Sequence, residues 1–302
     1  MTDSLPLADR IVLPRWTPGH AVTSDGLRLV TEGALPTIRA RDPLEGFGPL
    51  DARGLTRWQD AAVLALTETT TTNAVAMLLA ECGAPDGTCV LAGRQTLGRG
   101  RSGRVWDSPL GGGLYYSVVL SQFGAQVAQW LPLVGALSWV RVLEGYGLKP
   151  QLKWPNDLLL DGQKLGGVLA EGTSGALVLG IGINLRSSPN RDPRLDPHVA
   201  RLEEYLDPLP DMTHLFLHAY AHLEALVQHI EEASRGAFET QPYVDELRAR
   251  CVTLGADVRY LHQGAEMRAH AVDLDARGGL IVRREDGSTE TIYAGDVHLV
   301  RP

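Results

Sequence analysis

The feature that most constrains the fold is a glycine-rich loop. The stretch GRGRSG (98–103) follows TCVLAGRQT (88–96), a run typical of a buried strand. Its spacing satisfies the G-x-G-x-x-G pattern of dinucleotide-binding folds, in which a helix begins at the loop and presents its N-terminus to a pyrophosphate. Here VWDSPLGGG (105–113) follows, and its proline and glycines cannot start a helix. The sequence therefore excludes a dinucleotide-binding fold, and it also contains no GxxxxGK[ST] phosphate loop.

The same loop carries three arginines, Arg99, Arg101 and Arg104. Glycines allow the backbone to approach a ligand, and guanidinium groups bind carboxylate or phosphate through two parallel hydrogen bonds. An arginine–glycine tract for nucleic acid is the alternative, but such tracts repeat in low-complexity flanks, whereas this one lies between predicted strands. The pattern favours a small anionic ligand over a purely structural loop, and predicts a loop that is mobile until the ligand is present.

Composition narrows the class of protein. The 302 residues are enough for two domains, with 44% hydrophobic residues and a net charge of -8 that argues against bulk nucleic-acid binding. No run of about 18 apolar residues predicts a membrane span, and the N-terminus lacks the basic start of a signal peptide. We therefore expect a cytoplasmic protein. The three cysteines show neither a disulfide pattern nor zinc-binding spacing.

Lysine is rare and clustered. Only Lys149, Lys153 and Lys164 occur among 28 basic residues, and they are consecutive in that set. Lysine is a compact point charge that arginine cannot always replace, so the region 149–164 is a candidate for charge chemistry. Chance retention at surface sites is the alternative, and Lys149 beside Pro150 fits it.

The segment KWPNDLLLDGQKLGG (153–167) gives this cluster its context. Pro155 restricts Trp154 to an extended conformation, and Asp161-Gly162 is a strong hairpin signal that places Lys164 across the turn from an acidic strand start. An acid and a lysine beside a basic loop suit a reaction in which charge builds on phosphate oxygens. A Trp-Pro corner with a surface salt bridge is the alternative.

The remaining pattern predicts alternating elements. Helices are expected over 73–81, 124–146 and 211–232, and strands over 88–96, 113–120, on both sides of Asp161-Gly162, and over 175–185. In the last helix His214, His218 and His222 recur every four residues, a spacing that could mimic a metal site. No carboxylate-flanked metal motif accompanies them, so a solvated helix face is favoured. The last 50 or so residues read as short strands with regular turns, typical of a small β-barrel. Residues 1–55 are proline-rich and show no helix pair of a helix-turn-helix.

Four segments together resemble the biotin protein ligase family. They are TTTN (70–73), GRQTLGRGRSGRVWDSPLGGGLYYSVVL (93–120), KWPNDLLLDGQKLGGVLAE (153–171) and GIGINL (180–185), in the family's order. The resemblance covers about 60–302. It implies an α+β fold with a central mixed sheet and flanking helices, a class II synthetase-like catalytic domain over 56–249, an SH3-like C-terminal β-barrel over 250–302, and a loop-rich extension over 1–55.

The resemblance also implies a reaction. Biotin and Mg-ATP give biotinyl-5′-AMP and pyrophosphate, and the biotinyl group passes to a lysine of a biotin carboxyl carrier protein or domain. The chain resembles the monofunctional type, without an N-terminal winged helix, so no DNA binding and no membrane association are expected, while a homodimer is possible in the family. A biotin-responsive transcriptional regulator and a lipoate or octanoate ligase of related fold are the alternatives.

The family's motifs carry site residues over to this chain. Lys164 and Arg101 match the catalytic positions, and Asp157 matches the metal side of the site, where Mg²⁺ would be held. The biotin-binding positions are Thr71, Thr72, Asn73, Gln95, Gly98, Arg99, Gly100, Arg101, Lys164, Gly166 and Gly167. The positions for ATP and the adenylate are Arg99, Arg101, Arg104, Trp106, Asn156, Asp157, Lys164 and Asn184, with Asn184 reading the adenine edge. The family often has Ser where Thr71 stands and Arg where Ser102 stands, which lowers the charge of the loop here.

Overall fold

The computed structural model describes residues 63–66, 68–120, 125–172, 176–187, 199–236, 239–262, 264–293, 295 and 297–300. The predicted extension over 1–55, including its expected lack of a winged helix, lies outside these residues. The predicted domain limits at 56 and 250 stay predictions.

Within the described residues, seven strands form one mixed sheet in the order β1-β2-β3-β7-β6-β5-β4. The strands are β1 (Val63–Leu66), β2 (Cys89–Ala92), β3 (Gly113–Leu120), β4 (Gln151–Lys153), β5 (Asp157–Leu160), β6 (Gln163–Gly172) and β7 (Leu177–Asn184). Only the β1–β2 pair is parallel among them. The predicted α+β class with a central mixed sheet is confirmed.

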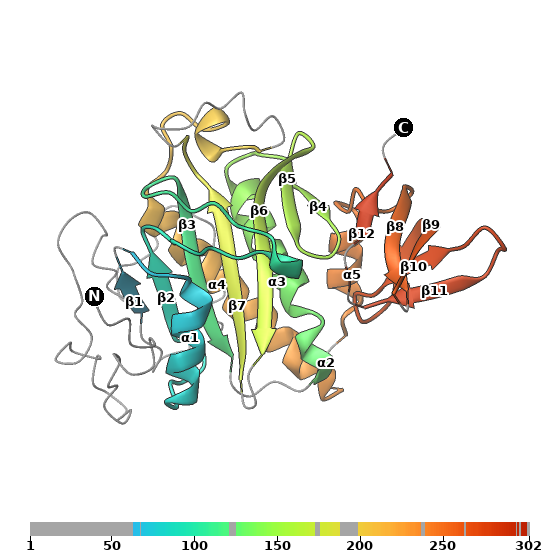
Figure 1. Ribbon diagram of the computed structural model, residues 1–302, viewed down its shortest axis with the longest axis horizontal. Helices are drawn as coiled ribbons and strands as arrows, with labels where there is room; N and C mark the ends of the chain where they lie inside the picture. The colour runs from blue at the N-terminus through green and yellow to red at the C-terminus, as the bar shows by residue number, and fades with distance from the viewer. Residues whose placement is uncertain are drawn as a thin grey trace, which may run out of the picture.

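Helices cover both faces of this sheet (Figure 1). The short helix α1 (Thr72–Glu81) packs on one face, and α3 (Leu131–Gly145) with α4 (Met212–Ser234) covers the other. Successive side chains of β3 point to opposite faces of the sheet. Val119 packs in the small core beneath α1, whereas Val118 and Leu120 pack in the main core on the other face. A strand covered on both faces is apolar throughout, which explains GLYYSVVL.

The hairpin between β5 and β6 forms where the sequence predicts it. Asp161 has φ 48° and Gly162 has φ 75°, the left-handed pair that a two-residue type I′ turn requires. The turn fixes the antiparallel register, so that Asp157 pairs with Gly167 and Leu159 with Lys164. A local irregularity between Leu158 and Leu159 offsets the two halves of the hairpin.

Two expectations about the helices are wrong. The single helix predicted over 124–146 is two helices, α2 (Ala125–Ala128) and α3, because Pro132 suits only the first turn of a helix. The histidine ridge of α4 is solvated only at its first residue: His214 is exposed, His222 is partly buried and His218 is 3% exposed. The long helix lies between the sheet-covering α3 and neighbouring segments, so little of its surface reaches water. Strand β1 and helix α5 (Gln241–Arg248) were not predicted.

The C-terminal strands form a second sheet, with five antiparallel strands among the described residues in the order β11-β10-β9-β8-β12. They are β8 (Asp257–His262), β9 (Ala265–Leu274), β10 (Leu280–Arg283), β11 (Thr289–Ile292) and β12 (Val297–Leu299). This is the small β domain that the regular turn spacing predicts.

Trp154 joins the two sheets. Its backbone N–H donates to Thr253 Oγ1 at 3.0 Å, and its indole Nε1 donates to Gly278 O in the β9–β10 turn at 3.0 Å. Gly278 has φ 78°, and a Cβ there would lie 2.5 Å from Leu133 Cδ1, so this turn needs glycine. The indole is 2% exposed, which makes Trp154 a core residue of the junction and not a surface corner.

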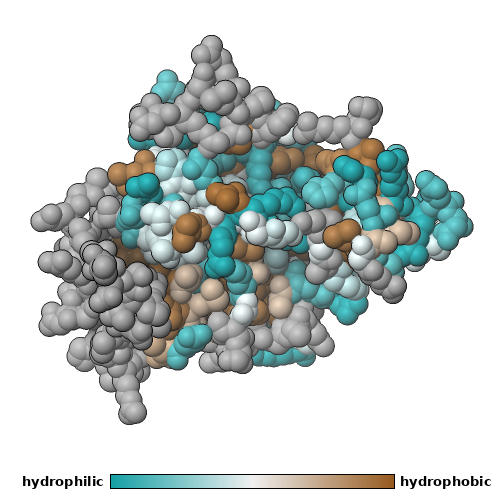
Figure 2. All heavy atoms as spheres, viewed as in Figure 1, coloured by the Kyte–Doolittle hydropathy of each residue, from teal (hydrophilic) through white to brown (hydrophobic). Residues whose placement is uncertain are grey.

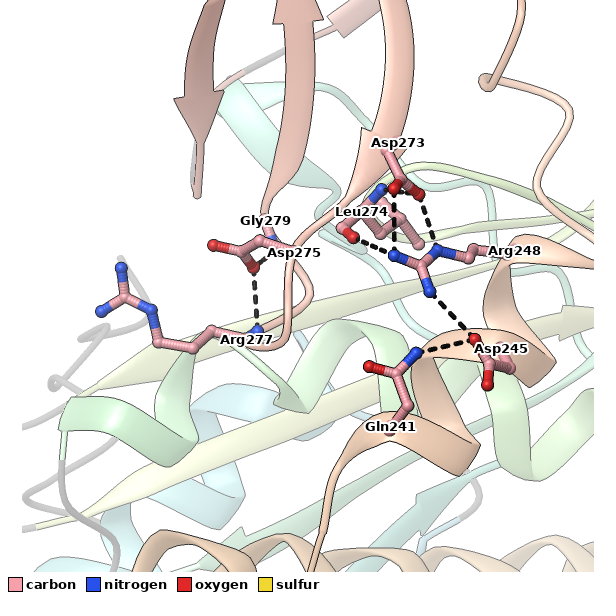
Figure 3. Close-up of polar contacts among 8 residues, drawn as sticks. All are labelled: Gln241, Asp245, Arg248, Asp273, Leu274, Asp275, Arg277 and Gly279. Atoms are coloured by element: carbon pink, nitrogen blue, oxygen red, sulfur yellow. Dashed lines mark hydrogen bonds and ion pairs between the residues drawn. The ribbon is translucent and has the colours of Figure 1, made fainter.

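A cluster of charged residues, formed by Arg248, Asp273 and Asp245 and called the clasp below, ties α5 (Gln241–Arg248) to the second sheet (Figure 3). Arg248 at the end of α5 donates to both carboxylate oxygens of Asp273 at 2.6 and 3.0 Å, and to Asp245 at 2.9 Å. Burial alone would raise the pKa of Asp273, but hydrogen bonds from Arg248 and the Leu274 N–H outweigh burial and lower it. The clasp therefore stays charged at neutral pH and ties α5 to β9.

The fold predicts a pH dependence of stability through His222. Burial, and then the nearby Arg141 cation, lower the pKa of His222 to about 4 from 6.5. The unfolded chain binds the proton more readily, and solvent screens part of the effect because His222 is only partly buried. The free energy of unfolding should therefore fall by about 1–2 kcal/mol as pH drops from 7 to 4. Urea unfolding across this range should show a shallower slope for His222→Gln, with exposed His214→Gln as the control. Equal slopes for the two variants would contradict this origin.

Candidate active site

A cavity of about 390 Å³ lies where α1 begins, where the glycine-arginine loop crosses the sheet, and where β7 ends. In Figure 1 the loop runs across the sheet face that carries α1, and its 3-10 turn η3 (Arg101–Gly103) comes close to β6. Fourteen of the predicted site residues line this cavity: Thr71, Thr72, Asn73, Gln95, Arg99, Gly100, Arg101, Arg104, Trp106, Asn156, Asp157, Lys164, Gly167 and Asn184.

Two predicted site residues lie behind the cavity wall. A Cβ on Gly98 would lie 2.3 Å from Trp106 O, and a Cβ on Gly166 would lie 2.5 Å from Ile183 Cδ1. Both glycines permit close packing against neighbouring atoms and do not line the cavity, and their predicted contact with a ligand stays a prediction. Gly167, by contrast, lines the cavity, and a Cβ added there would lie 3.4 Å from Lys164 Nζ.

One part of the cavity is a neutral polar cradle. The backbone N–H and the hydroxyl of Thr72 both donate to Gln95 Oε1, at 2.9 and 3.2 Å. Gln95 Nε2 then donates to Ser108 Oγ at 2.9 Å. Thr71 caps α1, where its Oγ1 accepts the Asn73 N–H at 3.1 Å. Each side chain is therefore held in one orientation before a ligand arrives.

Ser117 on β3 connects the two halves of this cradle. Its hydroxyl lies 2.7 Å from Thr72 Oγ1 and 2.6 Å from Asn73 Oδ1, so its single proton serves one of two close acceptors. Asn73 Nδ2 donates to Glu171 Oε2 at 2.7 Å. The Asn73 amide fits because residue 180 is glycine, where a Cβ would lie 2.1 Å from Asn73 Oδ1.

The other part of the cavity is cationic. Lys164 Nζ donates to Asp157 Oδ1 at 2.6 Å and lies 5.3 Å from the centre of the Trp106 ring. The Trp106 indole in turn covers Gly182, where a Cβ would lie 2.6 Å from its Nε1. The turn at Asp161-Gly162 thus brings lysine and carboxylate together as the sequence predicts, beneath an aromatic wall.

The Lys164 carbonyl organises a third group of residues. It accepts the Ala200 N–H at 3.0 Å and Asn184 Nδ2 at 3.2 Å. Asn184 therefore stands at the end of β7 with its amide orientation fixed. The same backbone position holds the segment after residue 198 against β6, through the parallel bridge between Lys164 and Val199.

The glycine-arginine loop contacts both sheets. Arg101 donates through Nη1 to Asn156 Oδ1 at 3.0 Å and through Nη2 to Gly295 O, before β12, at 2.7 Å. Asn156 is held in turn, because its Nδ2 donates to Val168 O at 2.9 Å. Ser102 takes φ 54°, a left-handed conformation that bends the loop sharply. The predicted mobility of the loop stays a prediction.

The wall of the cavity is strongly positive although the chain is acidic. Seven cations line it, against the two carboxylates Asp107 and Asp157: Arg99, Arg101, Arg104, Lys153, Lys164, Arg186 and Arg201. Hydrophilic residues also cover much of the molecular face seen in Figure 2. An anionic ligand is the chemistry that such a wall favours.

Comparison with known proteins identifies the family. Residues 63–188 match the model described as the biotin/lipoate A/B protein ligase family, and residues 253–300 match the biotin protein ligase C-terminal domain. The biotin–[acetyl-CoA-carboxylase] ligase of Mycobacterium tuberculosis is 32% identical over 265 residues, which cover 82% of this chain and 95% of that protein. The chain belongs to the biotin protein ligase family. Its five-stranded sheet is therefore the SH3-like domain of that family.

Other biotin protein ligases agree in fold and sequence. The Aquifex aeolicus enzyme, solved in complex with biotin and ATP, matches with a TM-score of 0.64 and 27% identity over 80% of this chain and 99% of that chain. The bifunctional ligase/repressor BirA of Bacillus subtilis is 39% identical, over 38% of each chain. Similarity to biotin protein ligases thus spans both sheets.

Several residues that line the cavity or hold its side chains were missed by sequence reasoning. Ser117 and Ser108 are buried hydroxyls within or beside strands, and Arg201 is a buried cation on the cavity wall. Ser117 interrupts an otherwise apolar strand, which was a usable signal. Ser108 and Arg201 carry no such signal, because their placement depends on contacts distant in the chain.

We predict that Ser117 holds the polar cradle together. Ser117→Ala leaves Asn73 Oδ1 buried without its donor, so the free energy of unfolding should fall by about 1–3 kcal/mol. The matched control is Ser138→Ala, because Ser138 is equally buried but donates only to a helix carbonyl, Gly135 O. Urea unfolding measures both variants. Equal stabilities would show that the Ser117 contacts contribute nothing.

Proposed function

We propose that the cavity of this chain activates biotin with ATP as biotinyl-5′-AMP and passes the biotinyl group to a lysine of a carrier domain. One observation carries the proposal: a neutral polar cradle and a cationic wall share a single cavity. Biotin has a neutral urea ring and an anionic carboxylate, so it needs both kinds of surface at once.

The cradle suits the urea ring. Urea offers two N–H donors and a carbonyl acceptor, and Thr71, Thr72, Asn73 and Gln95 present hydroxyl and amide groups. Because Ser117 and Glu171 already orient these side chains, little conformational entropy is lost on binding. We assign the biotin head group to this part of the cavity.

The cationic wall suits the first half-reaction. The biotin carboxylate oxygen attacks the α-phosphorus of ATP, a new O–P bond forms, and the bond to the β-phosphate breaks to release pyrophosphate. Negative charge builds on the phosphate oxygens meanwhile. The Lys164 ammonium, with Arg99 and Arg101 from the loop, neutralises that charge. Lys164 acts as an electrostatic stabiliser and forms no covalent bond.

The second half-reaction needs an acceptor. The amine of a carrier lysine attacks the acyl carbon of the adenylate, forms an amide, and releases AMP. We infer an acetyl-CoA-carboxylase carrier as the partner, because relatives carry that name. In this step the loop residues Arg99 and Arg101 hold the adenylate until the acceptor arrives.

Asp157 fits the metal that accompanies ATP. Mg²⁺ usually combines one or two carboxylates with substrate phosphates and water, and Asp157 offers one carboxylate 2.6 Å from the Lys164 ammonium. We infer that Asp157 holds the ion, which would neutralise phosphate charge. Asn156 positions Arg101 at the same place through the 3.0 Å bond.

The wider setting of the enzyme is also proposed. An ATP-dependent reaction on a carrier protein fits a cytoplasmic location, and no helix of the described residues could cross a membrane. A homodimer, the absence of DNA binding, and the monofunctional character are carried over from the resemblance. Operator binding in a mobility-shift assay would favour a biotin-responsive transcriptional regulator. Acceptance of lipoate in place of biotin would favour a lipoate or octanoate ligase.

The decisive test is carrier biotinylation. The protein, incubated with biotin, Mg-ATP and a carrier domain, should give biotinylated acceptor, detected as a mass increase. Lys164→Ala should slow adenylate formation by about 10²–10³-fold, since it removes a preorganised charge from the phosphates. Lys149→Ala is the matched control, because Lys149 is an exposed lysine outside the cavity. Absence of product with the wild-type chain would refute the ligase assignment.

Arg101→Gly should affect retention more than chemistry. It removes the hydrogen bonds to Asn156 and to Gly295, so the loop loses its attachment to both sheets. The adenylate should then leak and acylate lysines of bystander proteins, measured as biotin incorporation into albumin. Release kinetics identical to those of the wild type would contradict this role.

A further inference from the structure

Arg201 is a buried cation on the wall of the active-site cavity. It is 7% exposed, and among the residues that the structure describes no other Arg or Lys is buried. A guanidinium taken out of water needs strong compensation from hydrogen bonds or opposite charge. The groups that surround Arg201 therefore indicate which partner compensates its buried charge.

The compensation within the chain is weak. Arg201 Nη1 lies 3.3 Å from Glu204 Oε1 and 3.5 Å from Val199 O, both longer than a strong charge-assisted bond. Glu204 is also half in solvent, with 39% of its side chain exposed. Glu204 has a separate role, because its Oε2 accepts the Arg201 N–H at 3.1 Å and closes the capping box of η5 (Leu202–Glu204). The ion pair alone does not account for a buried arginine.

The backbone directs Arg201 into the cavity. Along 199–201, Val199 and Arg201 line the cavity, whereas Ala200 between them is fully buried in the main core. Val199 bridges to Lys164, and the Ala200 N–H and Asn184 Nδ2 share the Lys164 carbonyl. Ala200 and Asn184 thus meet at one carbonyl, and Arg201, the residue after Ala200, lines the cavity on the carbonyl side of Lys164.

The two sides of Lys164 have different chemistry. Its ammonium points to Asp157 and Trp106, where the proposed function places the phosphates. Its carbonyl faces Asn184, the residue expected at the adenine edge. A cation on the carbonyl side lies away from the phosphate cations and close to the base.

We propose that Arg201 is a nucleotide-binding residue that contacts the adenine ring beside Asn184. A planar guanidinium can stack on a purine face and can donate to a ring nitrogen, which acts only as an acceptor. The bound adenine then interacts with the guanidinium, which Glu204 compensates only weakly at 3.3 Å. This assignment rests on the proposed function, since it takes ATP as the substrate.

The test compares a nucleotide with and without phosphates. Arg201→Ser should raise the KM for ATP by about tenfold, and should weaken adenosine binding, measured by calorimetry, by a similar factor. Adenosine carries the base and ribose but no phosphate, so it reports the base contact alone. Biotin affinity should change less than twofold. Arg235→Ser is the control, because the Arg235 side chain, directly after α4, is 70% exposed and also pairs with a glutamate.

Three results would overturn the proposal. A higher KM for ATP with unchanged adenosine affinity would place Arg201 at the phosphates. Equal losses of adenosine and biotin affinity, with lowered thermal stability, would make it a structural residue. Unchanged ATP and adenosine binding would remove it from the site. Arg201→Lys keeps the charge without the planar group, and full recovery of adenosine affinity in it would also exclude a stacking contact.

The two assignments fail separately. Loss of carrier biotinylation in the wild-type chain would count against the ligase function, whereas adenosine calorimetry on wild type and Arg201→Ser tests the base contact directly.

Discussion

The arrangement of the site depends on Lys164, whose two ends organise different chemistry. Its ammonium pairs with Asp157 at 2.6 Å, and its carbonyl accepts bonds from Asn184 and Ala200. The first contact follows from the register of one hairpin, set by the left-handed pair Asp161 and Gly162, whereas the second depends on the end of β7 and on the bridge between Lys164 and Val199. A shift by one residue would turn the Lys164 ammonium to the opposite face of the sheet and remove it from the cationic wall.

The cavity is lined by a buried part and by a more exposed part. The cradle side chains are already locked by Ser117 and Glu171, within elements buried on both faces of the sheet. The loop residues Arg99 and Arg101 sit on a glycine-rich segment with far fewer buried contacts. The locked cradle suits the recognition of a rigid neutral ring. The glycine-arginine loop suits a reacting anion that must enter and leave the site.

Sequence reasoning succeeded where the information is local. The Asp161-Gly162 turn, the apolar run of β3 and the loop that cannot become a helix are all readable within a few residues. It failed where tertiary contacts decide. His218 looks solvated in the sequence but is buried, and the place of Arg201 on the cavity wall depends on the bridge between Val199 and Lys164.

Trp154 shows that the small sheet is not an exchangeable module. Its indole is fully enclosed between the β9–β10 turn and α3, and one continuous apolar core runs from β3 through α4 into β8 and β10. Cutting the chain near residue 250 would expose that core and release the strand that leads into Asn156 and Asp157. Since the two sheets share one core, we expect them to unfold together, with the C-terminal strands supporting the segment that carries Asn156 and Asp157.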